Sequence, residues 1–241
     1  MRFLLGLLLL LAGGCMSIPG VHYTPRQCSV QGHGVRIAGP TDQHMLACLR
    51  RMPPSSVVTI TSEGGSVSAA LDIADILATW KAELIVERYC ESSCANYLIP
   101  VSHSVVIRPG ARVVLHGSVD GHMVAQGAPL SLFMRQKSFA QDHDVHPGWL
   151  LMRTDEDFKA RRNGASVAGA VDAVSASPRR FIVVEPAFAA TCLPDVPVRW
   201  EPQTYADKMR GDADLRRRKE ADGFVLSGSL SCSEARTYPD L

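Results

Sequence analysis

Between positions 55 and 115, apolar runs typical of strands alternate with segments whose apolar residues recur at helical spacing. Four short runs rich in β-branched residues are typical of buried strands. These runs are Ser55–Thr61, Leu84–Val86, Ser104–Ile107 and Arg112–Leu115. Between the first two, apolar residues recur at near-helical spacing, which predicts a helix over Ser66–Trp80. Ser66 is a suitable N-cap for this helix.

A second helix is expected to begin at Ser93 and to continue to Leu98, before Pro100 breaks it. The order along the chain is then strand, helix, strand, helix, strand. Such alternation favours a parallel sheet whose strands are joined by right-handed crossovers. The sequence therefore predicts an α/β fold with a mostly parallel sheet.

The periodicity weakens beyond residue 122. Leu130–Gln141 is helical in character and is expected to arch over the candidate site described below. Phe181–Glu185 is a good strand candidate. The charge-rich segment Tyr205–Ala221 predicts a solvated helix or a hairpin of helices. No internal repeat is visible.

The N-terminus has the character of a targeting segment. Arg2 is followed by an apolar run, Phe3–Leu11, that is too short to span a bilayer. The following Ala-Gly-Gly-Cys resembles a bacterial lipobox, in which Cys15 would be lipidated, although Ala12 replaces the usual leucine. The alternative is an ordinary secretory signal cut near Gly14. Either reading predicts an exported protein.

This start suggests four parts. Residues 1–15 are the signal peptide with lipidated Cys15, and residues 16–27 are a linker. Residues 28–180 are the core, and residues 181–241 are a C-terminal strand and helix extension. The expected location is the bacterial cell envelope, with a lipid anchor facing the periplasm and the outer membrane favoured over the inner.

Six cysteines remain after Cys15, and an even number in an oxidising compartment suggests disulfides. Cys90-x3-Cys94 has no nearby pair of His or Cys partners, so disulfides are favoured over zinc, with the two cysteines bonded to each other or to distant ones. Sequence cannot choose among the 15 possible pairings of six cysteines. The formal net charge is +1, and only 6% of residues are aromatic. No basic cluster is interleaved with aromatic residues, which argues against nucleic-acid binding. No cofactor or metal is expected.

Three segments carry candidate chemistry. Ser92 and Ser93 stand where a strand is expected to turn into a helix, next to free backbone N–H groups and the positive helix end. His116 follows the last of the four strands and could act as general base and acid. The Gly64-Gly65 turn could bring a second N–H group towards an oxyanion. Together they outline a serine-hydrolase site.

These segments resemble those of the Clp-type serine peptidases. Ser62-Glu-Gly-Gly-Ser-Val-Ser68 is similar to their glycine turn, and Ser93-Cys-Ala-Asn-Tyr-Leu98 to their nucleophile segment. Pro109-Gly-Ala-Arg-Val-Val-Leu-His116 is similar to the strand that leads to their catalytic histidine. The order is the same, and the Cys-Glu-Ser-Ser-Cys-Ala arrangement looks closest to exported bacterial relatives. The resemblance covers roughly residues 55–120.

The resemblance implies a Clp/crotonase-like β-α-β superhelix. It makes Ser93 the nucleophile and His116 the base, with the N–H groups of Gly65 and Cys94 as the oxyanion hole. A Cys-x-Ser-x-Cys register favours Ser92 instead. Glu63 replaces the usual proline of the glycine turn, where its charge would oppose an oxyanion.

The third member of the triad is open. The candidate carboxylates are Asp155, Asp157 and Asp195, whereas Asp172 is assigned a structural role. His122 is kept as a spare candidate base because it lies close to the site in sequence.

The leading hypothesis is an exported serine peptidase or hydrolase that acts on a peptide or protein through an acyl-enzyme. A homo-oligomer is expected because relatives of this type often form rings or trimers. The competing hypothesis is a non-catalytic, Clp-like envelope lipoprotein with a binding or assembly role, since a fold does not guarantee its activity.

Overall fold

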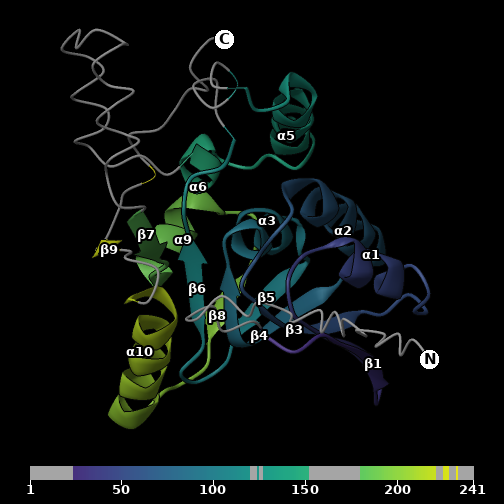
Figure 1. Ribbon diagram of the computed structural model, residues 1–241. Helices are drawn as coiled ribbons and strands as arrows, with labels where there is room; N and C mark the ends of the chain where they lie inside the picture. The colour runs from purple at the N-terminus through teal and green to yellow at the C-terminus, as the bar shows by residue number, and fades with distance from the viewer. Residues whose placement is uncertain are drawn as a thin grey trace, which may run out of the picture.

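The computed structural model describes residues 24–119, 124, 127–151, 180–220, 225–227 and 232. Within these residues the chain forms a nine-stranded sheet with helices packed against it (Figure 1). The strands are β1 (Gln27–Gln31), β2 (Gly34–Ala38), β3 (Val57–Ser62), β4 (Glu83–Glu91), β5 (Ser104–Ile107), β6 (Arg112–Leu115), β7 (Arg180–Val183), β8 (Val198–Trp200) and β9 (Val225–Ser227). The helices are α1 (Gln43–Leu49), α2 (Val67–Trp80), the π-helical η1 (Cys94–Leu98), α3 (Ile99–Val101), α5 (Leu130–Asp142), α6 (Pro147–Leu151), α9 (Pro186–Cys192) and α10 (Tyr205–Glu220).

The strands pair in the order β1-β2-β3-β4-β6-β7-β9, and β5 pairs with β4 and β8 away from this path. Strands β2, β3, β4, β5, β6 and β8 pair in parallel with one another. The antiparallel contacts are those of β1 with β2 and of β7 with β6. The predicted α/β class with a mostly parallel sheet is confirmed.

Strand β4 organises the sheet because its two halves have different neighbours. Its first half pairs with β5, from Glu83 to Val86, and its second half pairs with β6, from Tyr89 to Glu91. The chain therefore leaves β4 directly beside the end of β6. This register brings the residue after Glu91 next to His116, and the N–H of Ser92 donates to Val114 O at 2.8 Å.

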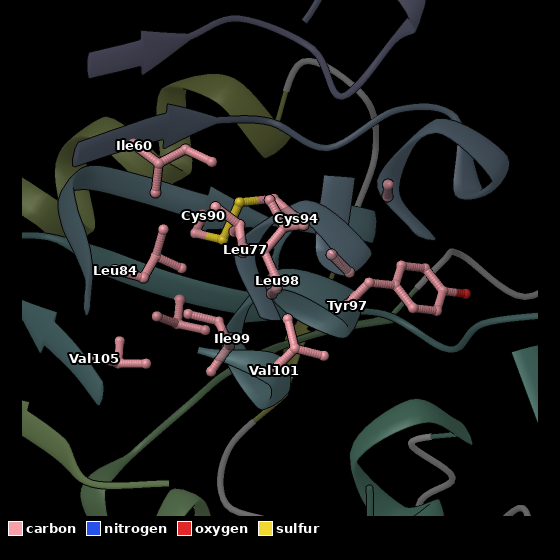
Figure 2. Close-up of a cluster of buried hydrophobic side chains, with 14 of the residues drawn as sticks. Ile60, Leu77, Leu84, Cys90, Cys94, Tyr97, Leu98, Ile99, Val101 and Val105 are labelled. Atoms are coloured by element: carbon pink, nitrogen blue, oxygen red, sulfur yellow. A yellow bond between two sulfur atoms is a disulfide. The ribbon is translucent and has the colours of Figure 1, made fainter. Parts of the chain in front are cut away.

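Helices α2 and η1 supply the apolar face that covers the parallel strands. Leu77 of α2 and Leu98 of η1 lie in one buried cluster with Ile60, Leu84 and Val105 of the strands (Figure 2). Helix α2 begins as predicted, because the Ser66 side chain accepts from the N–H of Ala69 at 3.3 Å. Burial of these side chains supplies the main favourable term for this part of the fold.

Several predicted elements match the structure closely: β3, α2, β5, β6, α5 and α10. Pro100 was expected to break a helix, yet the chain continues into α3. Helix α3 follows the π-helical η1 without a break, so the proline lies in a continuous helical segment whose preceding turn departs from the α-helical hydrogen-bond pattern. Strands β7, β8 and β9 join the same sheet as β2–β6. The division into domains stays a prediction.

Several other predictions lie outside the described residues: the signal peptide with Cys15, His122, Asp155, Asp157 and Asp172. In the part of the chain that the structure describes, no helix has the length and apolar character needed to cross a membrane.

Candidate active site

Ser92 and His116 form the centre of the candidate site. The Ser92 hydroxyl is hydrogen-bonded to Nε2 of His116. Nδ1 of the same ring lies 3.2 Å from Gly117 O. A carbonyl oxygen can only accept, so the tautomer that satisfies this contact has its proton on Nδ1 and accepts from Ser92 at Nε2. This is the protonation state that a general base for a serine requires.

The backbone of Ser92 is in the left-handed region, with φ of +55°. A side chain in this region costs roughly 1–2 kcal/mol relative to the ordinary helical region. Such strain persists only where the surroundings enforce it, and it clusters at functional sites. Here β4 ends and η1 begins on either side of the residue, so the sharp turn points the hydroxyl towards His116.

Ser93 occupies a different environment. It is 2% exposed, its φ of −58° is ordinary, and its hydroxyl shares a hydrogen bond of 2.6 Å with Oγ1 of Thr41. The sequence favoured a contact between Ser93 and His116. The structure corrects it: Ser92 lies on the imidazole, and Ser93 points back towards Thr41.

The glycine turn packs directly against the serine turn. Gly64 has φ of +87°, and a Cβ there would lie 2.5 Å from Glu91 O and 2.6 Å from Cβ of Ser92. Gly65 has φ of +150°. Thr41 holds this turn, because its N–H donates to Gly64 O at 2.9 Å and its carbonyl accepts from Ser66 at 2.8 Å. A side chain on Gly64 would push the two turns apart.

Two backbone N–H groups near this junction are candidate oxyanion donors. Within the described residues, the N–H groups of Gly65 and Ser93 donate no hydrogen bond. The sequence proposed Gly65 with Cys94, since the residue after the nucleophile supplies the second donor. With Ser92 on the imidazole, that residue is Ser93, so the second candidate donor moves by one position.

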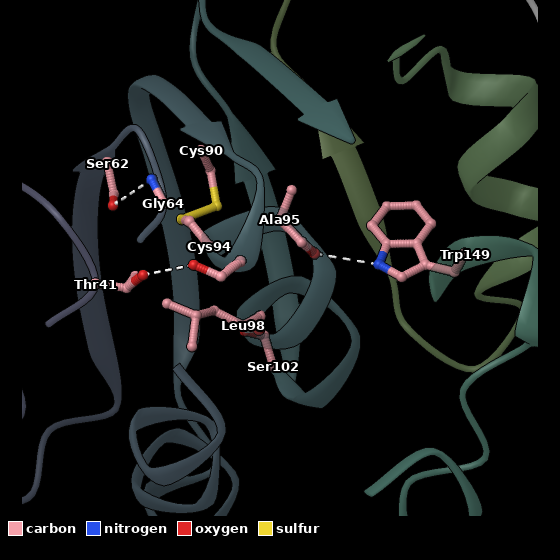
Figure 3. Close-up of a disulfide and its surroundings, with 10 residues drawn as sticks. Thr41, Ser62, Gly64, Cys90, Cys94, Ala95, Leu98, Ser102 and Trp149 are labelled. Atoms are coloured by element: carbon pink, nitrogen blue, oxygen red, sulfur yellow. Dashed lines mark hydrogen bonds between the residues drawn. A yellow bond between two sulfur atoms is a disulfide. The ribbon is translucent and has the colours of Figure 1, made fainter. Parts of the chain in front are cut away.

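The structure pairs the cysteines as Cys28–Cys48, Cys90–Cys94 and Cys192–Cys232. The expectation that Cys90 and Cys94 are disulfide-bonded is confirmed, and of the open pairings the structure has them bonded to each other. These two residues are fully buried, and their Cα atoms lie 5.3 Å apart (Figure 3). The bond ties the last residues of β4 to the first residue of η1 and so closes a small ring around Ser92.

A buried polar network supports the segment that follows His116. The Ser118 hydroxyl accepts from Nδ2 of Asn96 at 2.6 Å and bonds to the Tyr97 hydroxyl at 2.7 Å. The N–H of Ser118 donates to Leu150 O at 2.9 Å. Gln136 of α5 extends the network, accepting from Tyr97 at 2.7 Å and donating to Val119 O at 2.8 Å. Helix α5 thus contacts the segment after His116, near where the sequence placed it.

Of the candidate carboxylates for the triad, Asp195 lies in the part of the chain that the structure describes. Asp195 is exposed on the turn before β8, and β8 runs parallel to β5 and β4. Asp195 therefore lies at the edge where these strands begin, whereas Ser92 and His116 follow the edge where β4 and β6 end. This placement is inconsistent with a role for Asp195 in orienting the ring. Glu63 turns away towards the N-terminal segment, where Oε1 accepts from Thr24 at 3.3 Å.

Sequence reasoning missed Thr41 as part of the site. Thr41 lies before α1, in a stretch for which the apolar pattern predicted no element. Its bridge to Gly65 is a contact between residues far apart in the sequence. The only local signal was Asp42, a good N-cap residue, which accepts from the N–H groups of His44 and Met45 at 2.9 Å each.

No protein-family model matches the chain, and no curated protein matches it. Similar solved structures include a ClpP1 mutant from Listeria monocytogenes, with a TM-score of 0.41 and 14% identity over 73% of this chain and 94% of that chain. DspI from Pseudomonas aeruginosa has a TM-score of 0.38 and 13% identity over 86% of this chain and 78% of that chain. An enoyl-CoA hydratase from Shewanella pealeana has a TM-score of 0.36 and 11% identity over 85% and 83%. At such low scores the likenesses carry no conclusion about activity, and the fold class rests on the strand pairing itself.

Proposed function

We propose that the protein is a serine hydrolase in which Ser92 is the nucleophile and His116 the general base. The observation that carries the proposal is the strained Ser92, whose hydroxyl is hydrogen-bonded to Nε2 of His116. A serine hydroxyl is a weak nucleophile until a base accepts its proton. The arrangement supplies that base within hydrogen-bond reach.

The proposed substrate is a peptide or protein. Oγ of Ser92 bonds to the carbonyl carbon while its proton passes to Nε2 of His116. The negative oxygen is stabilised by the N–H groups of Gly65 and Ser93. His116 then gives the proton to the leaving amine as the C–N bond breaks. Water hydrolyses the resulting ester with His116 again acting as the base, which restores both residues.

The three disulfides support the further proposal that the protein is exported, because such bonds persist in oxidising compartments. Together with the lipobox-like segment before Cys15, they support a lipid-anchored protein of the bacterial envelope. Metabolic labelling with a palmitate analogue tests the anchor: the wild type should be labelled and Cys15→Ala should not. Labelling of both proteins would place lipidation elsewhere, and labelling of neither would favour the secretory signal.

A fluorophosphonate probe tests the chemistry on the purified protein. The wild type should be labelled, Ser92→Ala should lose the label, and Ser93→Ala is the matched control that should keep it. Retention of the label in Ser92→Ala, with loss in Ser93→Ala, would move the nucleophile to Ser93. A folded wild type that is not labelled would favour the non-catalytic binding role.

A further inference from the structure

A buried ion pair lies directly behind the candidate nucleophile. Glu91 precedes Ser92 in the chain and is fully buried, and its Oε1 pairs with the guanidinium of Arg218. The Arg218 side chain is only 10% exposed, and it belongs to α10, far along the chain. Removal of two charges from water is costly, so a pair of this kind needs close partners to be tolerated.

Tyr89 completes this cluster. The Arg218 guanidinium lies 3.6 Å from the centre of the Tyr89 ring, a cation–π geometry. Burial raises the pKa of Tyr89 above its ordinary value of 10.0, so the hydroxyl is neutral at physiological pH. Its oxygen shares a hydrogen bond of 2.5 Å with Oγ1 of Thr24. Arg218 thus contacts two residues of β4 within the last three positions before Ser92.

The ion pair and the Cys90–Cys94 disulfide lie on opposite faces of β4. Successive side chains of a strand point to opposite faces of the sheet. Tyr89 and Glu91 therefore face α10, whereas Cys90 faces η1. The serine turn is held from one side by a covalent bond and from the other side by a charge pair.

Helix α10 is itself fixed to the strand that ends in His116. Arg112 of β6 donates to Asp212 Oδ1 at 2.9 Å and to Lys208 O at 2.7 Å. Leu215 is buried against Val114 of the same strand. One helix therefore holds β6 through these contacts and β4 through Arg218, and Figure 1 shows it beside this part of the sheet.

We propose that Arg218 is a positioning residue that sets the distance between Ser92 and His116 by acting through Glu91. This inference rests on the proposed hydrolase function. Without Arg218, the Glu91 carboxylate loses its guanidinium partner in a buried site, and the end of β4 shifts to solvate it. The shift moves Ser92 relative to His116 while the rest of the sheet stays in place.

The test compares Arg218→Met with Arg217→Met, the matched control. Arg217 is the adjacent residue, its side chain is 74% exposed, and it pairs with Asp214 at 3.5 Å. Fluorophosphonate labelling is followed over a range of probe concentrations, which gives a maximal labelling rate and a half-saturating probe concentration. Arg218→Met should lower the maximal rate by about tenfold or more with little change in half-saturation, because misalignment affects the reacting atoms more than probe binding. Arg217→Met should stay within about twofold of the wild type.

A third variant separates positioning from misfolding. Glu91→Gln/Arg218→Met removes both charges, and it should recover most of the lost rate if the Glu91 charge that has lost Arg218 is the cause. Failure of this rescue in a folded double variant would overturn the proposal. So would an Arg218→Met protein that is labelled as fast as the wild type.

Amide hydrogen exchange provides a readout that does not depend on activity. The Ser92 N–H, which donates to Val114 O, should exchange at least about tenfold faster in Arg218→Met than in Arg217→Met. If the wild type is not labelled, the hydrolase function fails, and exchange alone decides whether Arg218 holds the turn. Equal exchange in both variants would contradict the positioning role.

Discussion

The two sides of the serine turn differ in almost every respect, although they belong to adjacent residues of the same type. On one side, Ser92 has a left-handed backbone, and its hydroxyl is on the half-buried His116. On the other, Ser93 has an ordinary helical backbone, and its hydroxyl is buried against Thr41. The first side combines a strained backbone with a hydroxyl–imidazole hydrogen bond, and the second satisfies a buried polar group.

At such a turn, residue type is a poor guide to the surroundings of a side chain. The hydroxyl of Ser93 is a structural link between the serine turn and the residue that holds the glycine turn. Ser92 projects from the other side because Gly64 packs against the turn without a side chain. Backbone geometry, and not residue type, therefore separates the surroundings of the two serines.

Removal of the His116 imidazole should slow labelling at Ser92 and leave the Ser93–Thr41 contact intact. His116→Gln is expected to slow fluorophosphonate labelling by about 100-fold to 10,000-fold, the usual contribution of a general base. The melting temperature should change little, because His116 is only half buried. His103→Gln is the control, since His103 is exposed before β5, and it should label at the wild-type rate. A similar loss in both variants would contradict the role of His116.

A methyl group on Gly64 should displace the whole serine turn, and so affect both Ser92 and Ser93. Gly64→Ala would place Cβ 2.5 Å from Glu91 O, so the two turns must separate. We expect a loss of about 2–4 kcal/mol in the free energy of unfolding, from overpacking and left-handed strain together. Urea denaturation measures this loss. Labelling of the folded protein should also fall.

Gly32→Ala is the control for Gly64→Ala, because it measures the cost of a left-handed backbone without overpacking. Gly32 also has positive φ, +58°, but a Cβ there meets nothing within 4 Å. It should cost only about 1 kcal/mol and leave labelling intact. Equal costs at Gly32 and Gly64 would show that the glycine turn is not packed against the serine turn.

Removal of the Cys28–Cys48 disulfide should cost more stability, whereas removal of the Cys90–Cys94 disulfide should cost more labelling. The Cys28–Cys48 loop has a sequence separation of 20 and the Cys90–Cys94 loop one of 4. Loop-closure entropy then predicts a stability loss of about 3 kcal/mol for Cys28→Ala/Cys48→Ala and about 2 kcal/mol for Cys90→Ala/Cys94→Ala. Labelling should fall severalfold only in the second, because that bond closes around Ser92. Chemical denaturation and labelling rates measure the two effects, and a larger labelling loss in the first pair would contradict the account.

Thr41→Val should affect only the Ser93 side, and by the smallest amount. The substitution leaves the buried Ser93 hydroxyl without its partner, which costs about 1–3 kcal/mol. Thr41→Val/Ser93→Ala removes both hydroxyls and should recover part of that loss. Urea denaturation of the three proteins measures the coupling, and additive losses would show that the two hydroxyls do not interact. Labelling at Ser92 should change by less than about threefold.

The sequence predicted the parallel centre of the fold well because those strands and α2 are buried with clear periods. It missed β1, β2 and α1, where Asp42 was the one local signal of a helix start. It predicted a strand at Phe181–Glu185 without a direction, and the structure places β7 antiparallel to β6. The direction of that strand depends on chain path and not on its own residues.

Two features of the candidate site could be found from local sequence, and two could not. The involvement of Cys90 and Cys94 in disulfides, though not their pairing, and the order of the glycine turn, serines and histidine were visible in the motifs. The choice between Ser92 and Ser93 depends on a left-handed residue and on Thr41, which is 52 positions away from its partner. The Glu91–Arg218 pair spans 127 positions, and no spacing rule connects them.

The central claim is that Ser92 is the reactive residue, and mass spectrometry of the labelled wild-type protein tests it most directly. After reduction, trypsin should release the peptide Tyr89–Arg112, which contains both serines, because the Arg108–Pro109 bond resists trypsin. Fragment ions that separate residue 92 from residue 93 locate the phosphonyl group. The account predicts the added mass on Ser92 with Ser93 unmodified, and an added mass on Ser93 would contradict it.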